Sequence, residues 1–141
     1  MAAFPHAAYR IYSKRGDSDC AIAAMATVFR RDYEEVLIAA AKVSPVAWKS
    51  GLTWVQMRSV ARRLKLKTRV RKAIPHPDFD MEAETGVLWV GHHDTTTEHC
   101  VVLLDGGWII DPEYNPAVIS EHDDYLRVHN AYPGALLQVV E

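Results

Sequence analysis

The period of the hydrophobic pattern changes once along this 141-residue chain, near residue 64. Before that point apolar residues recur three or four positions apart, as in Trp54, Met57 and Val60, which is the spacing of an amphipathic helix. After it, apolar and basic residues alternate over residues 64–70, which is strand spacing with one basic face. Helices followed by strands predict an α+β domain, with the helices on one face of an antiparallel sheet.

Three segments have the composition and spacing of helices: residues 20–29, residues 33–42 and a segment that begins after Thr53. The first is rich in alanine, and Asp17, Ser18 or Asp19 can cap it. Thr53 is a capping residue for the third. These signals predict that Cys20 lies in the first turn of a helix.

Four short segments rich in Val, Ile, Leu and Trp follow as predicted strands: residues 86–90, 100–104, 108–110 and 135–140. Between the second and the third, Asp105-Gly106-Gly107 predicts a tight hairpin turn. These two strands are therefore expected to pair in antiparallel fashion.

The length fits one compact domain over residues 1–141. Sixteen Lys and Arg against eighteen Asp and Glu give a formal net charge of −2, which argues against a general nucleic-acid binder. No apolar run approaches the roughly 20 residues of a membrane span, and the N-terminus lacks the apolar core of a signal peptide. We therefore expect a cytoplasmic domain with no membrane contact.

Two cysteines, Cys20 and Cys100, lie 80 residues apart. A disulfide framework needs more cysteines, and a thiolate zinc site usually pairs them about two to four residues apart. Both can be ordinary buried thiols, which are common in intracellular proteins. The alternative is that one of them is a nucleophile, because the unpaired N–H groups at a helix start stabilise a thiolate, and Cys20 is predicted there.

A cysteine nucleophile needs a base and a group that fixes the imidazole ring of that base. His99 directly precedes the predicted strand 100–104, and Asp111 ends the strand after the hairpin. If the two strands pair about residue 105, His99 and Asp111 lie near one another across the hairpin. The sequence therefore predicts that Cys20, His99 and Asp111 act together.

Several short motifs resemble the papain-like cysteine peptidases that remove double-glycine leaders from bacteriocins. Residues 19–25 (Asp-Cys-Ala-Ile-Ala-Ala-Met) resemble the nucleophile helix of that family, and residues 99–103 (His-Cys-Val-Val-Leu) resemble the strand that carries its histidine. Residues 110–112 (Ile-Asp-Pro) resemble its Asp-Pro, and residues 51–53 (Gly-Leu-Thr) with the helix that follows resemble its middle helix. The order Cys, His, Asp and the intervals of 79 and 12 residues also suit the family.

The resemblance implies a papain-like fold and a role for each matching residue. Cys20 would be the nucleophile, His99 the general base and then acid, and Asp111 the orienting residue. The family has a glutamine six residues before its cysteine, whose amide helps to bind the oxyanion, and here that position is Lys14. An ammonium group can donate to an oxyanion, but it is a flexible point charge. We assign Lys14 and Asp19 to the supporting, oxyanion side of the site.

The predicted activity is hydrolysis of an amide bond in a protein or peptide substrate, through thiolate attack and an acyl-enzyme. This chemistry needs no metal and no organic cofactor. Two alternatives stay open. The fold can serve as a catalytically silent binding module, for example a phage-encoded viral inhibitor of a host protein, or the same triad can transfer the acyl group to an amine.

A few further residues have predicted places around the site. Trp48 and His93 are expected to face the substrate, and Asn115 is the alternative orienting residue should the first aspartate point elsewhere. Cys100 should face the opposite side of its strand from the candidate base, and is therefore expected to be buried and inert. The histidine and acidic residues of segment 92–99 fit no established zinc motif, so no metal site is expected.

The segment from Arg58 to Lys72, here called the basic strip, holds eight of the sixteen basic residues and no acidic residue. A solvated helix and strand face is one interpretation. The other is a docking surface for an acidic partner. Aromatic residues do not interleave with the charges, so stacking on single-stranded nucleic acid is not expected.

Overall fold

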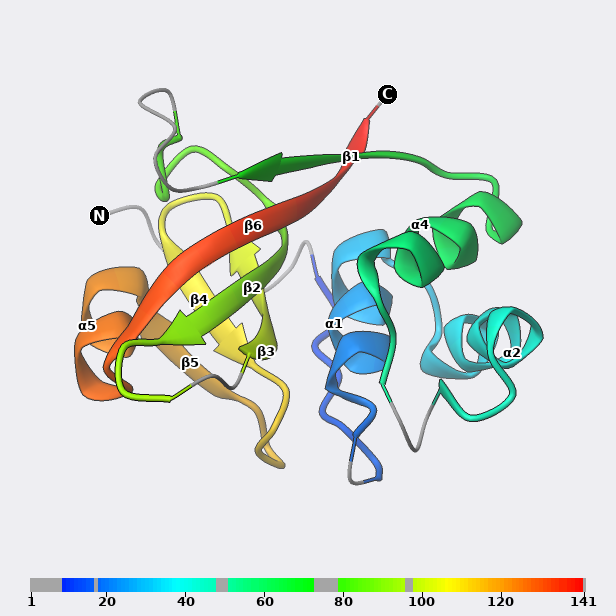
Figure 1. The fold of residues 1–141 in the computed structure, drawn as a ribbon, viewed down its shortest axis with the longest axis horizontal. Coiled ribbons are helices and arrows are strands. Elements are labelled where there is room, and N and C mark those ends of the chain that lie inside the picture. The colour runs from blue at the N-terminus through cyan, green and yellow to red at the C-terminus, as the bar shows by residue number, and fades with distance from the viewer. Residues whose placement is uncertain (1–8, 17, 48–50, 73–78, 96–97, 141) are drawn as a thin grey trace.

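A six-stranded antiparallel sheet, in the part of the chain that the structure describes, separates helices on its two faces (Figure 1). The structure is a computed structural model that describes residues 9–16, 18–47, 51–72, 79–95 and 98–140. The strands are β1 (Lys67–Lys72), β2 (Gly86–His92), β3 (Glu98–Leu104), β4 (Trp108–Asp111), β5 (Val118–Glu121) and β6 (Ala131–Val140). Their order is β1-β6-β2-β3-β4-β5, so the C-terminal strand lies between β1 and β2.

Among the described residues, three of the helices lie toward one face of the sheet and one lies on the other. The first three are α1 (Cys20–Phe29), α2 (Tyr33–Val43) and α4 (Trp54–Arg63), and the last is α5 (His122–Val128). The first helix contacts β2 and β3, α4 contacts β1, and α2 packs against both of these helices. On the opposite face α5 contacts β4, β5 and β6. The predicted α+β class, with the N-terminal helices packed on one face of an antiparallel sheet, is confirmed. The sequence did not predict α5, which covers the second face.

The alanine-rich helix α1 forms the centre of the larger core. Every residue from Ala21 to Phe29 is buried. The small side chains let the helix lie close to the sheet, where it packs against inward-facing residues such as Val102 and Leu104. The helix ends at Arg30, which has φ 56° and donates its backbone N–H to two carbonyls of the last turn. This packing fixes the position of the N-terminal residue, Cys20.

The predicted start of the third helix is confirmed in detail. Thr53 accepts a hydrogen bond from the Gln56 backbone N–H, and the Gln56 side chain accepts one from the Thr53 backbone N–H. This reciprocal capping box satisfies two backbone donors that the helix itself leaves unpaired. It holds the start of α4 beside the segment that begins at Gly51.

The strand predicted over residues 64–70 starts later than its alternation indicated. Leu64 caps the C-terminus of α4, and Lys65 takes a left-handed backbone conformation with φ 63°. The strand therefore begins at Lys67, and its partner is the C-terminal strand β6. Residues 64–66 therefore belong to the end of α4 and the turn that follows it, although their apolar and basic residues alternate as in a strand.

Two hydrophobic clusters fill the space on either side of the sheet. The larger one joins α1, α2 and α4 to the face that carries Val87 and Val102. The smaller one joins Tyr125 of α5 to the face that carries Leu88 and Leu136. Within the described residues, no helix is both long enough and apolar enough to cross a membrane.

Shortening a side chain in the smaller hydrophobic cluster should lower the stability of the whole domain. Leu136 is 0% exposed on a central strand, so Leu136→Ala is expected to lower the free energy of unfolding by about 2–5 kcal/mol in urea denaturation. The control Ile38→Ala removes a side chain that is 59% exposed, and should change it by less than about 0.5 kcal/mol. Equal effects of the two substitutions would contradict this division into core and surface.

Candidate active site

Cys20 is the first residue of α1, as predicted, and it is partly buried. The first hydrogen bond of the helix runs from the Ala23 N–H to the Asp19 carbonyl, 3.0 Å apart. The N–H groups of residues 20–22 therefore precede the helical ladder and leave a partial positive charge at this end. That charge favours an anion, either a thiolate on Cys20 or an oxyanion beside it.

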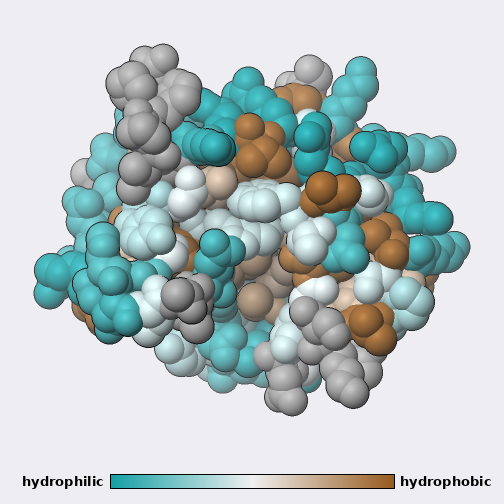
Figure 2. Space-filling model, in the orientation of Figure 1, coloured by the Kyte–Doolittle hydropathy of each residue, from teal (hydrophilic) through white to brown (hydrophobic). Residues whose placement is uncertain are grey.

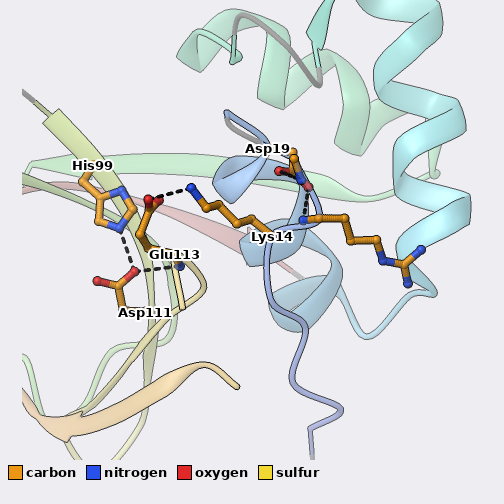
Figure 3. A network of polar contacts seen from close by, with 7 residues as sticks. Lys14, Asp19, His99, Asp111 and Glu113 are labelled. Carbon is orange, nitrogen blue, oxygen red and sulfur yellow. Dashed lines mark hydrogen bonds and ion pairs between the residues drawn. The ribbon is translucent and has the colours of Figure 1, made fainter. Parts of the chain in front are cut away.

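His99 and Asp111 meet, although not in the predicted register. Gly106 and Gly107 both have positive φ angles and form the turn, so Leu104 pairs with Trp108. Continued outward, this register sets His99 opposite residue 113 rather than opposite Asp111. The two side chains are diagonal neighbours on the same face, and His99 Nε2 lies 2.7 Å from Asp111 Oδ1 (Figure 3).

Asp111 is held by three donors in a buried setting. Its Oδ1 accepts the His99 ring N–H and the Glu113 backbone N–H at 2.9 Å, and its Oδ2 accepts the Tyr125 hydroxyl at 2.7 Å. Burial favours the neutral carboxyl, but these hydrogen bonds and the charge of His99 outweigh it, so the pKa of Asp111 is lowered. Tyr125 comes from α5, and no motif in the sequence identified it.

His99 and Cys20 shift each other toward the ionised forms. Burial disfavours the imidazolium, but hydrogen bonds to Asp111 and Cys20, together with their charges, raise the pKa of His99 to about 10. The pKa of Cys20 is lowered to about 5, first by hydrogen bonding to the Cys100 thiol and then by the hydrogen bond and charge of His99. Burial acts in the opposite direction but is outweighed. Since Nε2 of His99 is bonded to Asp111, Nδ1 is the ring nitrogen that remains for the Cys20 sulfur. Between these two pKa values the pair exists as thiolate and imidazolium.

Cys100 is buried, as predicted, but it is not remote from the site. Cys100 lines the same cavity as Cys20, and the two thiols shift each other's pKa. Strand alternation turns Cys100 toward the face that α1 covers, together with Val102 and Leu104. Burial and a raised pKa agree with the expected low reactivity of Cys100. Its place beside Cys20 was not expected, because the sequence did not show which helix lies on that face.

Lys14 lies next to the segment that follows Asp111. Its backbone N–H donates to the Pro112 carbonyl at 2.7 Å, and its Nζ lies 2.6 Å from Glu113 Oε1 (Figure 3). The side chain of Lys14 is only 21% exposed. Lys14 also lines a cavity of about 680 Å³ that it shares with Asn115. The ammonium group is thus held by an acidic partner beside the histidine and aspartate.

Asp19 supports the loop before α1 rather than the helix itself. It occupies the N-cap position, but its carboxylate accepts the backbone N–H groups of Arg15 and Gly16, both at 2.8 Å, and the hydroxyl of Tyr33. Burial raises its pKa, but these three donors prevail and the pKa of Asp19 is lowered. Asp19 makes no side-chain cap hydrogen bond and instead fixes the turn that leads into Cys20, whereas Asp17 lies outside the described residues.

A cavity of about 490 Å³ lies beside Cys20. Its walls include residues from α1, α4 and two strands: Cys20, Ala21, Gln56, Trp89, Glu98 and Cys100. The ring of Trp89 packs on that of Trp54, with centroids 3.5 Å apart. Figure 2 shows that this side of the molecule is hollowed near its centre, in the region where Figure 1 places β3 across from α1. Cys20 is therefore a partly buried residue in the wall of a cavity.

The remaining predicted site residues lie in different places. His93 is exposed in the turn after β2, with its ring 5.0 Å from that of Tyr132. Asn115 is exposed and lines the cavity shared with Lys14, whereas Asp111 contacts the histidine. Trp48 lies outside the described residues. In the described part of the chain, no group of three or more His, Cys, Asp or Glu side chains is placed to hold a metal ion.

The basic strip runs from α4 into the edge strand β1. Part of its charge has partners within the chain, because Arg58 donates to the Thr68 carbonyl and Arg71 forms an ion pair with Glu84. Arg62 and Lys67 line a cavity of about 360 Å³ between α4 and β1. Binding of an acidic partner to the basic strip stays a prediction.

The described chain is an α+β domain with helices on an antiparallel sheet and with a cysteine at the start of the helix that packs on β3. The structure resembles the peptidase domain of Streptococcus ComA, a bi-functional ABC transporter involved in a quorum-sensing pathway. That match has a TM-score of 0.56 and 16% identity, and it covers 94% of this chain and 98% of the other. The fold expected from the resemblance to bacteriocin-processing peptidases is therefore confirmed.

A second solved structure is the peptidase domain of Streptococcus mutans ComA in complex with a small-molecule inhibitor. It has a TM-score of 0.46 and 14% identity, and covers 94% of this chain and 100% of the other. No protein-family model and no curated protein matches the chain. The first of the two structures, at 16% identity, shows the fold alone.

The rate of Cys20 alkylation by iodoacetamide should report the pair of charges directly. Because the pKa of Cys20 is about 5, the thiolate should persist down to that pH, and the rate should fall only below it. His99→Ala removes a hydrogen bond and a positive charge, so the midpoint should move up toward the ordinary thiol pKa of about 8.5. Peptide mass spectrometry after pulses from pH 4 to 9 measures the profile.

Cys100→Ala is the second arm of this experiment. It removes the hydrogen bond that lowers the pKa of Cys20 most, so the midpoint should also rise while His99 is intact. Cys100 itself should stay unlabelled while Cys20 is ionised, because that contact and burial raise its own pKa. A wild-type midpoint near that of a free thiol would contradict the ion pair.

Proposed function

We propose that the chain is a cysteine peptidase-like hydrolase that cleaves an amide bond in a protein or peptide. The observation that carries this proposal is the chain of contacts from Cys20 through His99 to the buried Asp111. A nucleophile, a base and a group that orients the base are the three parts that thiol-dependent acyl transfer requires. The papain-like fold supports the same assignment.

The first half of the reaction forms an acyl-enzyme. The Cys20 thiolate attacks the amide carbonyl carbon, and the C=O electron pair moves onto oxygen to give an oxyanion. The N–H groups at the start of α1, and the ammonium of Lys14, are donors for that charge. The His99 imidazolium then gives its proton to the amide nitrogen, the C–N bond breaks, and the amine leaves.

The second half restores the enzyme. Neutral His99 takes a proton from water, the hydroxide attacks the thioester carbonyl, and the C–S bond breaks to release the acid and the Cys20 thiolate. Asp111 keeps Nε2 protonated throughout, so that Nδ1 faces the reacting atoms. Tyr125 and the Glu113 backbone N–H hold Asp111 in that orientation.

Cleavage of a peptide library tests the proposal without a known substrate. The wild-type chain should create new peptide termini that Cys20→Ala and His99→Ala do not create, as measured by mass spectrometry. Asp111→Asn keeps the shape of the side chain but favours the wrong histidine tautomer, so it should slow cleavage by about 10²–10⁴-fold. Circular dichroism on each variant checks that the fold is retained.

Other outcomes point to the alternatives. If the wild-type chain and Cys20→Ala give the same termini, the domain is catalytically silent and a binding function replaces hydrolysis. A parallel reaction with glycine methyl ester as acceptor separates the third function. Products that carry this amine in preference to water would identify a transferase.

The role of Lys14 can be tested with two neutral side chains of similar length. Lys14→Gln and Lys14→Met both remove the ion pair with Glu113, but only glutamine can donate a hydrogen bond. If this position donates to the oxyanion, kcat for a cleaved library peptide should be about 10²–10³-fold higher in Lys14→Gln than in Lys14→Met. KM should differ little between them. Equal kcat values would remove Lys14 from the oxyanion site.

A further inference from the structure

The two cysteines of the chain meet in one cavity. Cys20 comes from the start of α1 and Cys100 from β3, and both line the 490 Å³ cavity. Each thiol shifts the pKa of the other, because Cys100 lowers the pKa of Cys20 and Cys20 raises the pKa of Cys100. Hydrolysis requires only Cys20, so the role of the second sulfur is not explained by the proposed function.

The environment of the two sulfurs makes them chemically unequal. Cys20 is only partly buried, lies at a helix N-terminus and faces His99, all of which favour the thiolate. Cys100 is 6% exposed and belongs to the core cluster that packs under α1. Contact with Cys20 and burial raise the pKa of Cys100, so it keeps its proton while Cys20 is charged. One accessible thiolate beside one sheltered thiol is the arrangement of an attacking and a resolving cysteine.

We propose that Cys20 and Cys100 form a reversible intramolecular disulfide when the protein meets a peroxide, and that this disulfide switches off the Cys20 nucleophile. The modification site is the sulfur pair itself, and the co-reactant is hydrogen peroxide or another small hydroperoxide. The cavity admits such a molecule to Cys20. This inference rests on the two sulfurs and does not require that the chain hydrolyses amides.

The reaction balances in two steps. In the first, the Cys20 thiolate attacks one peroxide oxygen, the O–O bond breaks, and the leaving hydroxide takes a proton from the His99 imidazolium to form water. Sulfur is oxidised to the sulfenic acid and the peroxide is reduced by two electrons. In the second, the Cys100 sulfur attacks the Cys20 sulfur, the S–O bond breaks, and hydroxide leaves with the former Cys100 proton as water.

The structure also favours the second step over further oxidation. Once Cys20 is a neutral sulfenic acid, the negative charge that raises the pKa of Cys100 is gone. Neutral His99, having given up its proton, is then a base beside the pair. Both cysteines line the same cavity, and α1 packs directly against β3, so the fold brings the resolving residue to the place where Cys20 is oxidised.

The test uses the full chain, reduced, freed of reductant and kept dilute. After a pulse of hydrogen peroxide, remaining thiols are labelled with iodoacetamide under denaturing conditions, and the intact mass is measured. The expected product has lost two hydrogen atoms, carries no label, and yields a Cys20–Cys100 linked peptide on digestion. Dithiothreitol should restore two labels and the full alkylation rate of Cys20.

Cys100→Ser is the matched variant. Without a resolving thiol, its Cys20 should proceed to sulfinic and sulfonic acids, which dithiothreitol does not reverse. The wild-type arm decides the proposal even if this variant folds poorly. Over-oxidised Cys20 in the wild-type chain, a product of doubled mass from linked chains, or no reaction with peroxide would each overturn it. Disulfide formation without cleavage of any library peptide would instead overturn only the hydrolase proposal.

Discussion

The close packing of α1 against β3 is the contact on which the rest of the site depends. The helix can approach the sheet because four of its ten residues are alanine, and every residue after Cys20 is buried. That approach sets the sulfur of Cys20 against both His99 and Cys100, which are consecutive on β3. A larger side chain in place of Ala23 or Ala24 would push α1 away from the sheet. Cys20 would then move away from His99 and Cys100, although the new side chain would touch none of the three.

Asp111 sets the charges in this arrangement. A buried carboxylate is costly unless it is fully hydrogen bonded, and here the histidine, a backbone N–H and Tyr125 satisfy it. Once it is held as an anion, it stabilises the imidazolium of His99, and the imidazolium in turn stabilises the thiolate of Cys20. Negative Asp111, positive His99 and negative Cys20 therefore follow one another between α5 and the start of α1. The smaller core, which at first sight is only structural, thus supports the candidate nucleophile.

Local signals in the sequence were enough for part of this arrangement. The helix starts at Cys20 as predicted, although Asp19 makes no side-chain cap hydrogen bond. The hairpin that brings His99 near Asp111 depends on its turn residues, and its centre lies one position later than expected. Tyr125 could not be predicted, because α5 has seven mostly polar residues and only tertiary folding brings it to the site. The contact of Cys100 was missed for the same reason, since strand alternation gives the face of a residue but not the helix that covers it.

A nucleophilic thiolate is exposed to oxidants by the same properties that make it useful. A pKa near 5 keeps Cys20 charged at neutral pH, and the cavity of about 490 Å³ beside it is large enough for a peroxide. The residue after the histidine could have been any apolar side chain, because its position requires only burial under α1. A cysteine at that position fills the same space, donates a hydrogen bond that lowers the pKa of Cys20, and offers a sulfur that can capture a sulfenic acid. One side chain thus adjusts the reactivity of the nucleophile and limits its irreversible loss.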